Sequence, residues 1–127
     1  MKRTPALQPL SREHHTALTL AKACERAAQS RDEERIAKAC QRVIQAFSTE
    51  LEPHFQLEEQ SLLPLLHSAE NRQLEQRTWE DHRQLRALLD GLRQNNIAAL
   101  DSFGRLLSAH VRFEERELFP ALESLLP

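Results

Sequence analysis

Residues 54–66 read HFQLEEQSLLPLL and residues 110–122 read HVRFEERELFPAL, so the chain contains one thirteen-residue phrase twice. The copies agree at six positions, which hold His, Glu, Glu, Leu, Pro and Leu. Each copy places a glutamate four residues after its histidine, and residues four apart lie one above the other on one face of a helix. His54 with Glu58, and His110 with Glu114, therefore each direct an imidazole and a carboxylate toward one point. Two such points that face each other would hold a pair of metal ions.

The composition favours helices. The 127-residue chain contains 2 Gly and no Tyr, and it is rich in Leu, Ala, Glu, Gln and Arg. These residues favour helix and offer little for strands. A chain of this length forms one domain whose core is large enough to fold without disulfides. We therefore expect a single all-α domain over residues 1–127.

Charge and hydropathy exclude several classes of function. With 17 basic and 19 acidic side chains, the chain has no strong field for nucleic acid or anionic lipid. No run approaches the roughly 18 to 20 apolar residues that cross a bilayer, and the start, MKRTPALQPLSREHH, lacks the apolar core of a secretion signal. We expect a cytoplasmic protein, monomer or homodimer, with neither nucleic acid nor membrane as a partner.

The two cysteines are too few for a disulfide framework. In a reducing compartment Cys24 and Cys40 are interpreted as small buried hydrophobic residues. An alternative remains open. If two antiparallel helices turn near residues 31–32, the two thiols sit at similar heights and could form a redox pair.

Apolar residues recur at three- and four-residue spacing in four segments. Pro9 and Ser11 suit the start of the first helix, and Asn71 suits the start of the third. Pro53 should kink the second helix and Pro120 should break the fourth, because the proline ring removes a backbone donor. Short connections predict an up-down-up-down four-helix bundle, a fold that commonly builds metal sites in its core. The predicted helices cover about residues 11–29, 32–66, 72–94 and 97–119, followed by a short C-terminal tail helix.

The internal repeat extends to the other two helices. His15 lies in HTALTL and His82 lies in HRQLRALL, and each has a leucine three places on. Each helix would then send one histidine inward, whereas His14 and His67 fall off these faces and should be solvated. The predicted metal ligands are His15, His54, Glu58, His82, His110 and Glu114.

This ligand set has a definite chemistry. Four neutral imidazoles and two carboxylates, which can bridge two ions and cancel much of their charge, suit iron or manganese better than copper(I) or a structural zinc. Burying such a cluster without metal would cost several kcal/mol for each ionised group. Glu59 and Glu115 lie one residue further round the helix, so we expect them to support the ligands or to face solvent.

Each part of the pattern also has a plainer interpretation. A lone histidine on an apolar face is usually a hydrogen-bonded core residue, and an HxxxE pair on a Glu-rich helix can be a surface pair worth a few tenths of a kcal/mol. However, His54 and His110 alone among the 6 histidines have a glutamate at that offset. Because the two copies also agree in context, the metal site is favoured over a purely structural bundle.

With this set of histidines and HxxxE pairs, the chain resembles the hemerythrin-like, or HHE cation-binding, family. The resemblance extends over nearly the whole chain, from REHHTAL through HFQLEEQSLLP and EDHRQL to HVRFEERELFP. It implies a four-helix bundle around a non-haem di-iron centre with an oxo or hydroxo bridge, reactive toward dioxygen, nitric oxide or peroxide. Ferritin-like di-iron proteins are a poorer match, because their ExxH spacing occurs nowhere in the chain.

Two positions differ from the oxygen-carrying hemerythrins. Those proteins have an HxxxH pair on the third helix, where this chain has Thr78 four residues before His82. They also place an aspartate five residues after the last histidine, where this chain has Glu114 at four and Glu115 at five. The chain resembles more closely the iron-sulfur repair and nitric-oxide-responsive members of the family.

Two classes of function follow from the resemblance. In the first, the di-iron site binds or senses dioxygen or nitric oxide, or holds iron, and its occupancy alters a protein partner. In the second, the protein is a redox enzyme that reduces nitric oxide or peroxide or donates iron for cluster repair. The fold alone does not choose between them.

Overall fold

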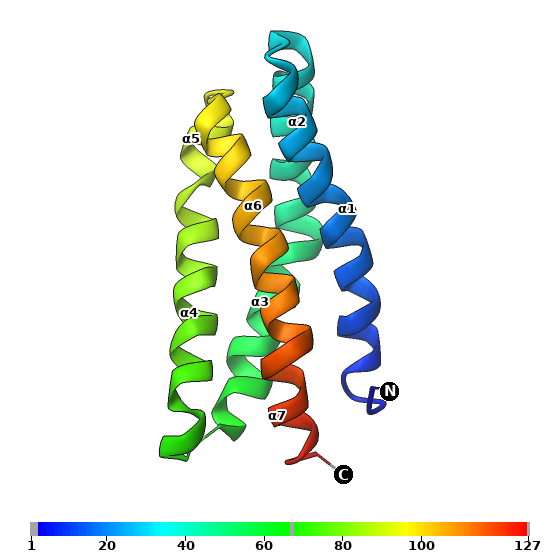
Figure 1. The fold of residues 1–127 in the computed structure, drawn as a ribbon, viewed down its shortest axis with the longest axis vertical. Coiled ribbons are helices and arrows are strands. Elements are labelled where there is room, and N and C mark those ends of the chain that lie inside the picture. The colour runs from blue at the N-terminus through cyan, green and yellow to red at the C-terminus, as the bar shows by residue number, and fades with distance from the viewer. Residues whose placement is uncertain (1–2, 67, 127) are drawn as a thin grey trace.

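The computed structural model describes residues 3–66 and 68–126, which form helices and turns without a strand. The helices of these residues form four rods. The rods lie side by side, and the two ends of the chain lie at the same end of the molecule (Figure 1). The predicted all-α four-helix bundle is confirmed. None of the helices in the described part of the chain combines the length and the apolar run that crossing a bilayer requires.

Each rod is a helix or a succession of helical turns. The first rod is α1 (Gln8–Ser30). The second comprises α2 (Glu33–Ala46), the π turn η1 (Phe47–Leu51), α3 (Glu52–Leu57), the π turn η2 (Glu58–Leu62) and the 3₁₀ turn η3 (Leu63–Leu65). The 3₁₀ turn η4 (Ala69–Asn71) precedes the third rod, α4 (Arg72–Ala87) and α5 (Leu89–Arg93). The fourth comprises α6 (Ile97–Phe113), the π turn η5 (Glu114–Leu118) and α7 (Phe119–Glu123).

Local signals set three of the helix ends. The left-handed backbone of Arg31 ends α1, and the Asp32 carboxylate accepts two backbone N–H groups at the start of α2. At the start of α6 the Asn96 amide oxygen accepts one backbone N–H, that of Ala99. Asn71 does precede α4, but its side chain makes no capping hydrogen bond there.

The helix widens before each of three prolines and continues past Pro53 and Pro120, whereas the second rod ends at Leu65, one residue after Pro64. The π turns η1, η2 and η5 stand directly ahead of Pro53, Pro64 and Pro120. In all three, the residue before the proline donates its N–H to the carbonyl five residues earlier. The ring lacks a donor and collides with the carbonyl four residues back, and the wider turn accommodates both effects. The expectation that Pro120 breaks the fourth helix is therefore wrong, because that helix continues to Glu123.

The core has two apolar parts. The larger one packs α1, α2 and α6 together and contains Cys24 and Cys40, both buried and unbonded to each other. Burial and the nearby Cys40 raise the pKa of Cys24 to about 12, so its reactive thiolate is suppressed. The smaller part gathers residues near the chain ends and in the turns, including Leu7, Leu63 and Phe119. Along the rods, the buried histidines and glutamates come between the residues of these two apolar parts.

Candidate metal centre

The structure brings five of the six predicted ligands together in the middle of the bundle. All five side chains are buried, and each of the last three rods supplies at least one of them. The π turns η2 and η5 begin at the two glutamates, so each glutamate stands directly after the helical turn that carries its histidine. The five residues are His54, Glu58, His82, His110 and Glu114.

The sixth predicted residue, His15, is exposed, and His14 takes its place in the cluster. Neighbouring residues on a helix point about 100° apart, so only one of them can face the core. The inward stripe of α1 runs Leu10, His14, Ala17, Ala21 and Cys24, at alternating spacings of four and three residues. The position of His14 in this stripe is the signal that the sequence offered. His67, expected to be solvated, lies outside the described residues.

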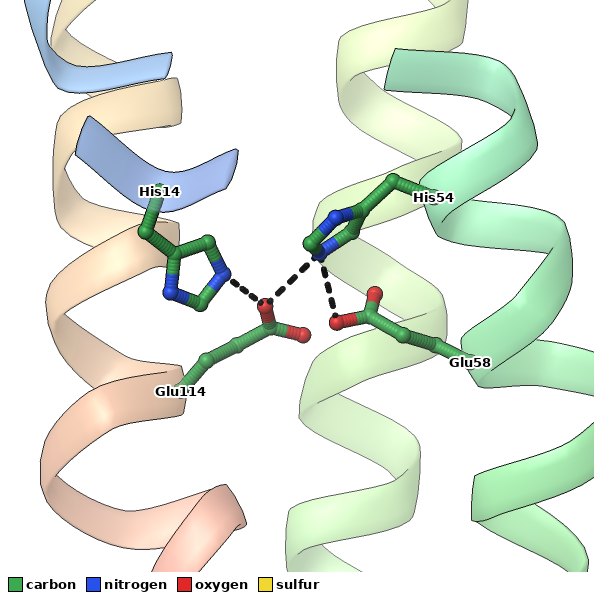
Figure 2. Close-up of side chains that lie close together, drawn as sticks. All are labelled: His14, His54, Glu58 and Glu114. Atoms are coloured by element: carbon green, nitrogen blue, oxygen red, sulfur yellow. Dashed lines mark hydrogen bonds and ion pairs between the residues drawn. The ribbon is translucent and has the colours of Figure 1, made fainter. Parts of the chain in front are cut away.

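The six side chains form two groups that share Glu58 and Glu114. In each group the candidate ligand atoms all lie within 4.8 Å of one another. We call them the His14/His54 subsite and the His82/His110 subsite after the histidines that are particular to each. Figure 2 shows the first, in which His14 and His54 approach the two carboxylates from different helices.

Each shared carboxylate extends one oxygen to each subsite. The Glu58 carboxylate places Oε2 3.0 Å from His54 Nε2 and Oε1 3.0 Å from His82 Nε2. The Glu114 carboxylate does the same, with distances of 2.9 Å from Oε1 to His14 Nε2 and 3.3 Å from Oε2 to His110 Nε2. This is the arrangement that two bridging carboxylates need.

The His82/His110 subsite contains buried polar atoms without hydrogen bonds. Its four inward atoms are fully buried and lie in pairs 3.0 and 3.3 Å apart, but none of them makes a hydrogen bond within the described residues. Such groups are rare in folded proteins, because each loses its hydration without compensation. A cation coordinated by all four would supply the missing interaction, so the residues present fit a metal. The atoms are Glu58 Oε1, His82 Nε2, His110 Nε2 and Glu114 Oε2.

Each imidazole also meets a carboxylate on its outer nitrogen. The Nδ1–H donates to that carboxylate, which fixes the tautomer and ring orientation and presents Nε2 to a metal. For Glu59 and Glu115 the sequence leaves open whether they support the ligands or face solvent, and the structure shows the former. For Glu13 and Asp81 the sequence gives no prediction. Both missed residues directly precede an inward histidine, in EHH and EDH, which was the available signal. The pairs are His14 with Glu115 (2.6 Å), His54 with Glu13 (2.8 Å), His82 with Glu59 (2.7 Å) and His110 with Asp81 (2.8 Å).

The metal-free cluster retains protons. Burial disfavours an imidazolium, but the nearby Glu114 carboxylate, at 3.6 Å, and the hydrogen bond with Glu58 outweigh it and raise the pKa of His54 to about 11. Burial is likewise outweighed at His110, where the charge of Glu114 and the bond to Asp81 raise the pKa to about 10. Burial and the charge of Glu114 raise the pKa of Glu58. Despite burial, the charge of His110 lowers the pKa of Glu114 well below its usual range. A bound cation would replace protons in this cluster.

A comparison with family models agrees with this geometry. Residues 6–122 match the model of the hemerythrin HHE cation binding domain. The chain belongs to this family. No curated protein and no solved structure gives a match. The chain is thus a hemerythrin-like cation-binding domain whose buried His/Glu cluster fits a metal site.

A pocket of about 160 Å³ reaches the hemerythrin-like site. Its inner end is formed by His14, His54, His110 and Glu114, and its rim includes the exposed residue Thr49. His82 and Glu58 do not line it. The volume is well above the roughly 10 to 15 Å³ that one water needs, so a diatomic molecule fits. The apolar walls are Ala17, Leu20, Leu51, Phe55, Leu107 and Val111.

Thr78 provides no ligand to the hemerythrin-like site. Its side chain is fully buried, and its hydroxyl donates to the Leu74 carbonyl of its own helix at 2.8 Å. The hydroxyl is therefore already committed to the backbone. The His82/His110 subsite accordingly has two histidines rather than three, the same number as the His14/His54 subsite.

Proposed function

We propose that the domain binds two non-haem iron ions, one in each subsite, and that the pair binds or senses dioxygen or nitric oxide. Holding iron is the simpler form of the same function. The unpartnered atoms of the His82/His110 subsite carry the proposal, because a buried set of imidazole and carboxylate atoms without hydrogen bonds suits a bound cation. The proposed ligands are His14, His54, Glu58, His82, His110 and Glu114.

The donor set supports iron. Each subsite offers two imidazoles and two carboxylate oxygens, and both cysteines lie in the apolar core rather than in the cluster. Nitrogen and oxygen donors without thiolate suit iron or manganese. Manganese is thus the alternative metal. The oxo or hydroxo bridge that the family implies stays a prediction.

The pocket supports a small ligand. Its apolar walls lead to His14, His54, His110 and Glu114, so a diatomic molecule would approach the His14/His54 subsite past mainly apolar surface. An iron pair, when bound, supplies electrons and open coordination positions to such a molecule. The chain supplies the apolar approach and holds the imidazoles in place through their Nδ1 partners.

Redox turnover is the second candidate function. Thr78 replaces a possible third histidine, which leaves only four protein donors in the His82/His110 subsite. Fewer protein ligands leave more coordination positions for reaction, as the reduction of nitric oxide or peroxide, or iron donation for cluster repair, would need. A protein partner and the cytoplasmic location also remain predictions from the sequence.

Anaerobic reconstitution with ferrous iron tests the proposal. We expect about two iron ions per chain, a higher melting temperature, and a change in the visible spectrum on adding dioxygen or nitric oxide. His82→Ala should lower the iron content, and Trp79→Ala, an exposed position on the same helix, should not. Iron content near zero with an unchanged melting temperature would contradict the metal site. Binding of two ions without any response to either gas would leave iron holding as the function.

A further inference from the structure

Three of the four outer carboxylates are fixed by an arginine. Arg3 Nε lies 3.3 Å from Glu115 Oε1, and Arg77 Nε lies 3.0 Å from Asp81 Oδ2. Arg86 binds both oxygens of Glu59, at 2.8 and 3.1 Å. Charge-assisted hydrogen bonds of this kind restrict the carboxylate and, through it, the histidine.

The fourth carboxylate, Glu13, has no such support. Within the described residues no arginine or lysine lies within ion-pair distance of it, and His54 is its one charged-group contact. Its side chain is 58% exposed, compared with 31% for Glu115, 9% for Glu59 and 7% for Asp81. His54 is buried, but water reaches the Glu13 carboxylate and competes for its bond, so this support is weaker than that of the three carboxylates held by arginine. His54 is therefore the ligand whose orientation is least secured.

The pocket opens beside this same ligand. Glu13 and His54 both line it, together with Pro53. Pro53 has no backbone N–H to donate and follows the π turn η1. By contrast, His82 lies flat against Phe55 with ring centroids 4.0 Å apart, and its side chain is wholly buried. An ion could reach the His14/His54 subsite from the pocket, which both of its histidines line, whereas in the His82/His110 subsite only His110 lines the pocket and His82 does not.

From these three observations we infer that the two subsites hold metal unequally. The ion in the His14/His54 subsite is the exchangeable one, and it enters and leaves through the pocket when Glu13 releases His54. The ion in the His82/His110 subsite is retained. Glu13 is a positioning residue, since it acts on the metal through His54. The inference rests on the proposed two-ion site and adds which ion can be lost or delivered.

The release of ferrous iron to a coloured chelator, followed anaerobically, tests this inference. The fully loaded protein should release its iron in two phases of about equal amplitude. Glu13→Gln keeps the size of the side chain but weakens its bond to His54, so the fast phase should accelerate about tenfold or more and the slow phase should not change. Asp81→Asn should accelerate the slow phase instead. Glu34→Gln, an exposed glutamate on α2 that pairs with Lys38, is the control and should change neither phase.

A second variant assigns the phases. His54→Ala should retain about one ion, and that ion should leave in the slow phase. Release of two ions in a single phase, or equal acceleration of both phases by Glu13→Gln, would overturn the inference while leaving the two-ion site intact. A wild-type chain that binds no iron would overturn the proposed function and this inference together. Circular dichroism of each variant separates ligand effects from loss of fold.

Discussion

Two neighbouring residues of α1, His14 and His15, differ in burial: the first imidazole is buried and the second is exposed. His14 bonds Glu114 through Nε2 and Glu115 through Nδ1, whereas His15 faces solvent. We expect His14→Ala to lose about one of two ions and His15→Ala to keep both, because only the former removes a donor atom. Metal analysis after anaerobic reconstitution measures this. If His15→Ala lost as much iron as His14→Ala, the inward face of α1 would be misassigned.

Local geometry explains which site residues were predictable. The offset of four residues from His54 to Glu58, and from His110 to Glu114, brings each pair together in any helix, so the pattern needs no knowledge of the fold. The choice between His14 and His15 depended on the phase of α1. The matching leucine context with His82 suggested His15, but the inward stripe of small and apolar residues fixes His14.

The supporting carboxylates were harder to predict, because they act between helices. Glu13 supports His54 across 41 positions of the sequence, and Asp81 supports His110 across 29. Spacing within one helix carries no information about such pairs. The arginines behind three of these carboxylates are equally non-local, since Arg3 meets Glu115 only because the two chain ends lie at the same end of the bundle.

At the scale of elements, α1 and α6 approach each other closely at Gly104. A Cβ added there would lie 2.7 Å from the Ala21 carbonyl oxygen, so the helices would have to separate. We expect Gly104→Ala to lower the free energy of unfolding by about 1 to 3 kcal/mol, the usual range for overpacking. This loss would appear despite the gain in helix propensity of about 1 kcal/mol that replacing glycine brings.

Urea unfolding of the metal-free protein measures the effect of Gly104→Ala. Ser102→Ala, at an exposed position of α6, is the matched control and should change stability by less than about 0.5 kcal/mol. Because α1 carries His14 and α6 leads to Glu114, separation of the helices should also weaken iron binding. A stability equal to or above that of the wild type would show that the two backbones are not in tight contact.

The prolines show where prediction of elements failed. The rule that proline removes a donor holds at Pro53, Pro64 and Pro120, but the rule does not say whether the helix ends or widens. Here packing decides: Phe119 and Leu122 beyond η5 are buried in the smaller apolar part of the core, which favours continuation of the helix. The number and order of the four rods, by contrast, follow from apolar periodicity and short connections alone.

At the scale of the whole molecule, protons and metal compete for one cluster. The pKa values of His54 and His110, about 11 and about 10, lie above the ordinary value of 6.5. The folded, metal-free protein therefore keeps protons that the unfolded chain has lost at neutral and alkaline pH. The stability from these two groups is fully present below about pH 6.5 and is lost as pH rises through 10 to 11.

Metal binding must have the opposite dependence on pH, because His54 and His110 can coordinate only after Nε2 has lost its proton. We expect the metal-free protein to melt at progressively lower temperature between pH 7 and pH 10, while the increase in melting temperature on adding ferrous iron grows over the same range. Calorimetric titrations at pH 7, in buffers with different ionisation enthalpies, should show that iron binding releases protons. A His54→Ala variant should release fewer protons.

Heats that do not depend on the buffer, or stabilisation by iron that is greatest at the lowest pH, would mean that the imidazoles are already neutral in the metal-free bundle. In that case the flanking carboxylates would not stabilise a positive charge on His54 and His110, although they lie within hydrogen-bond distance of them.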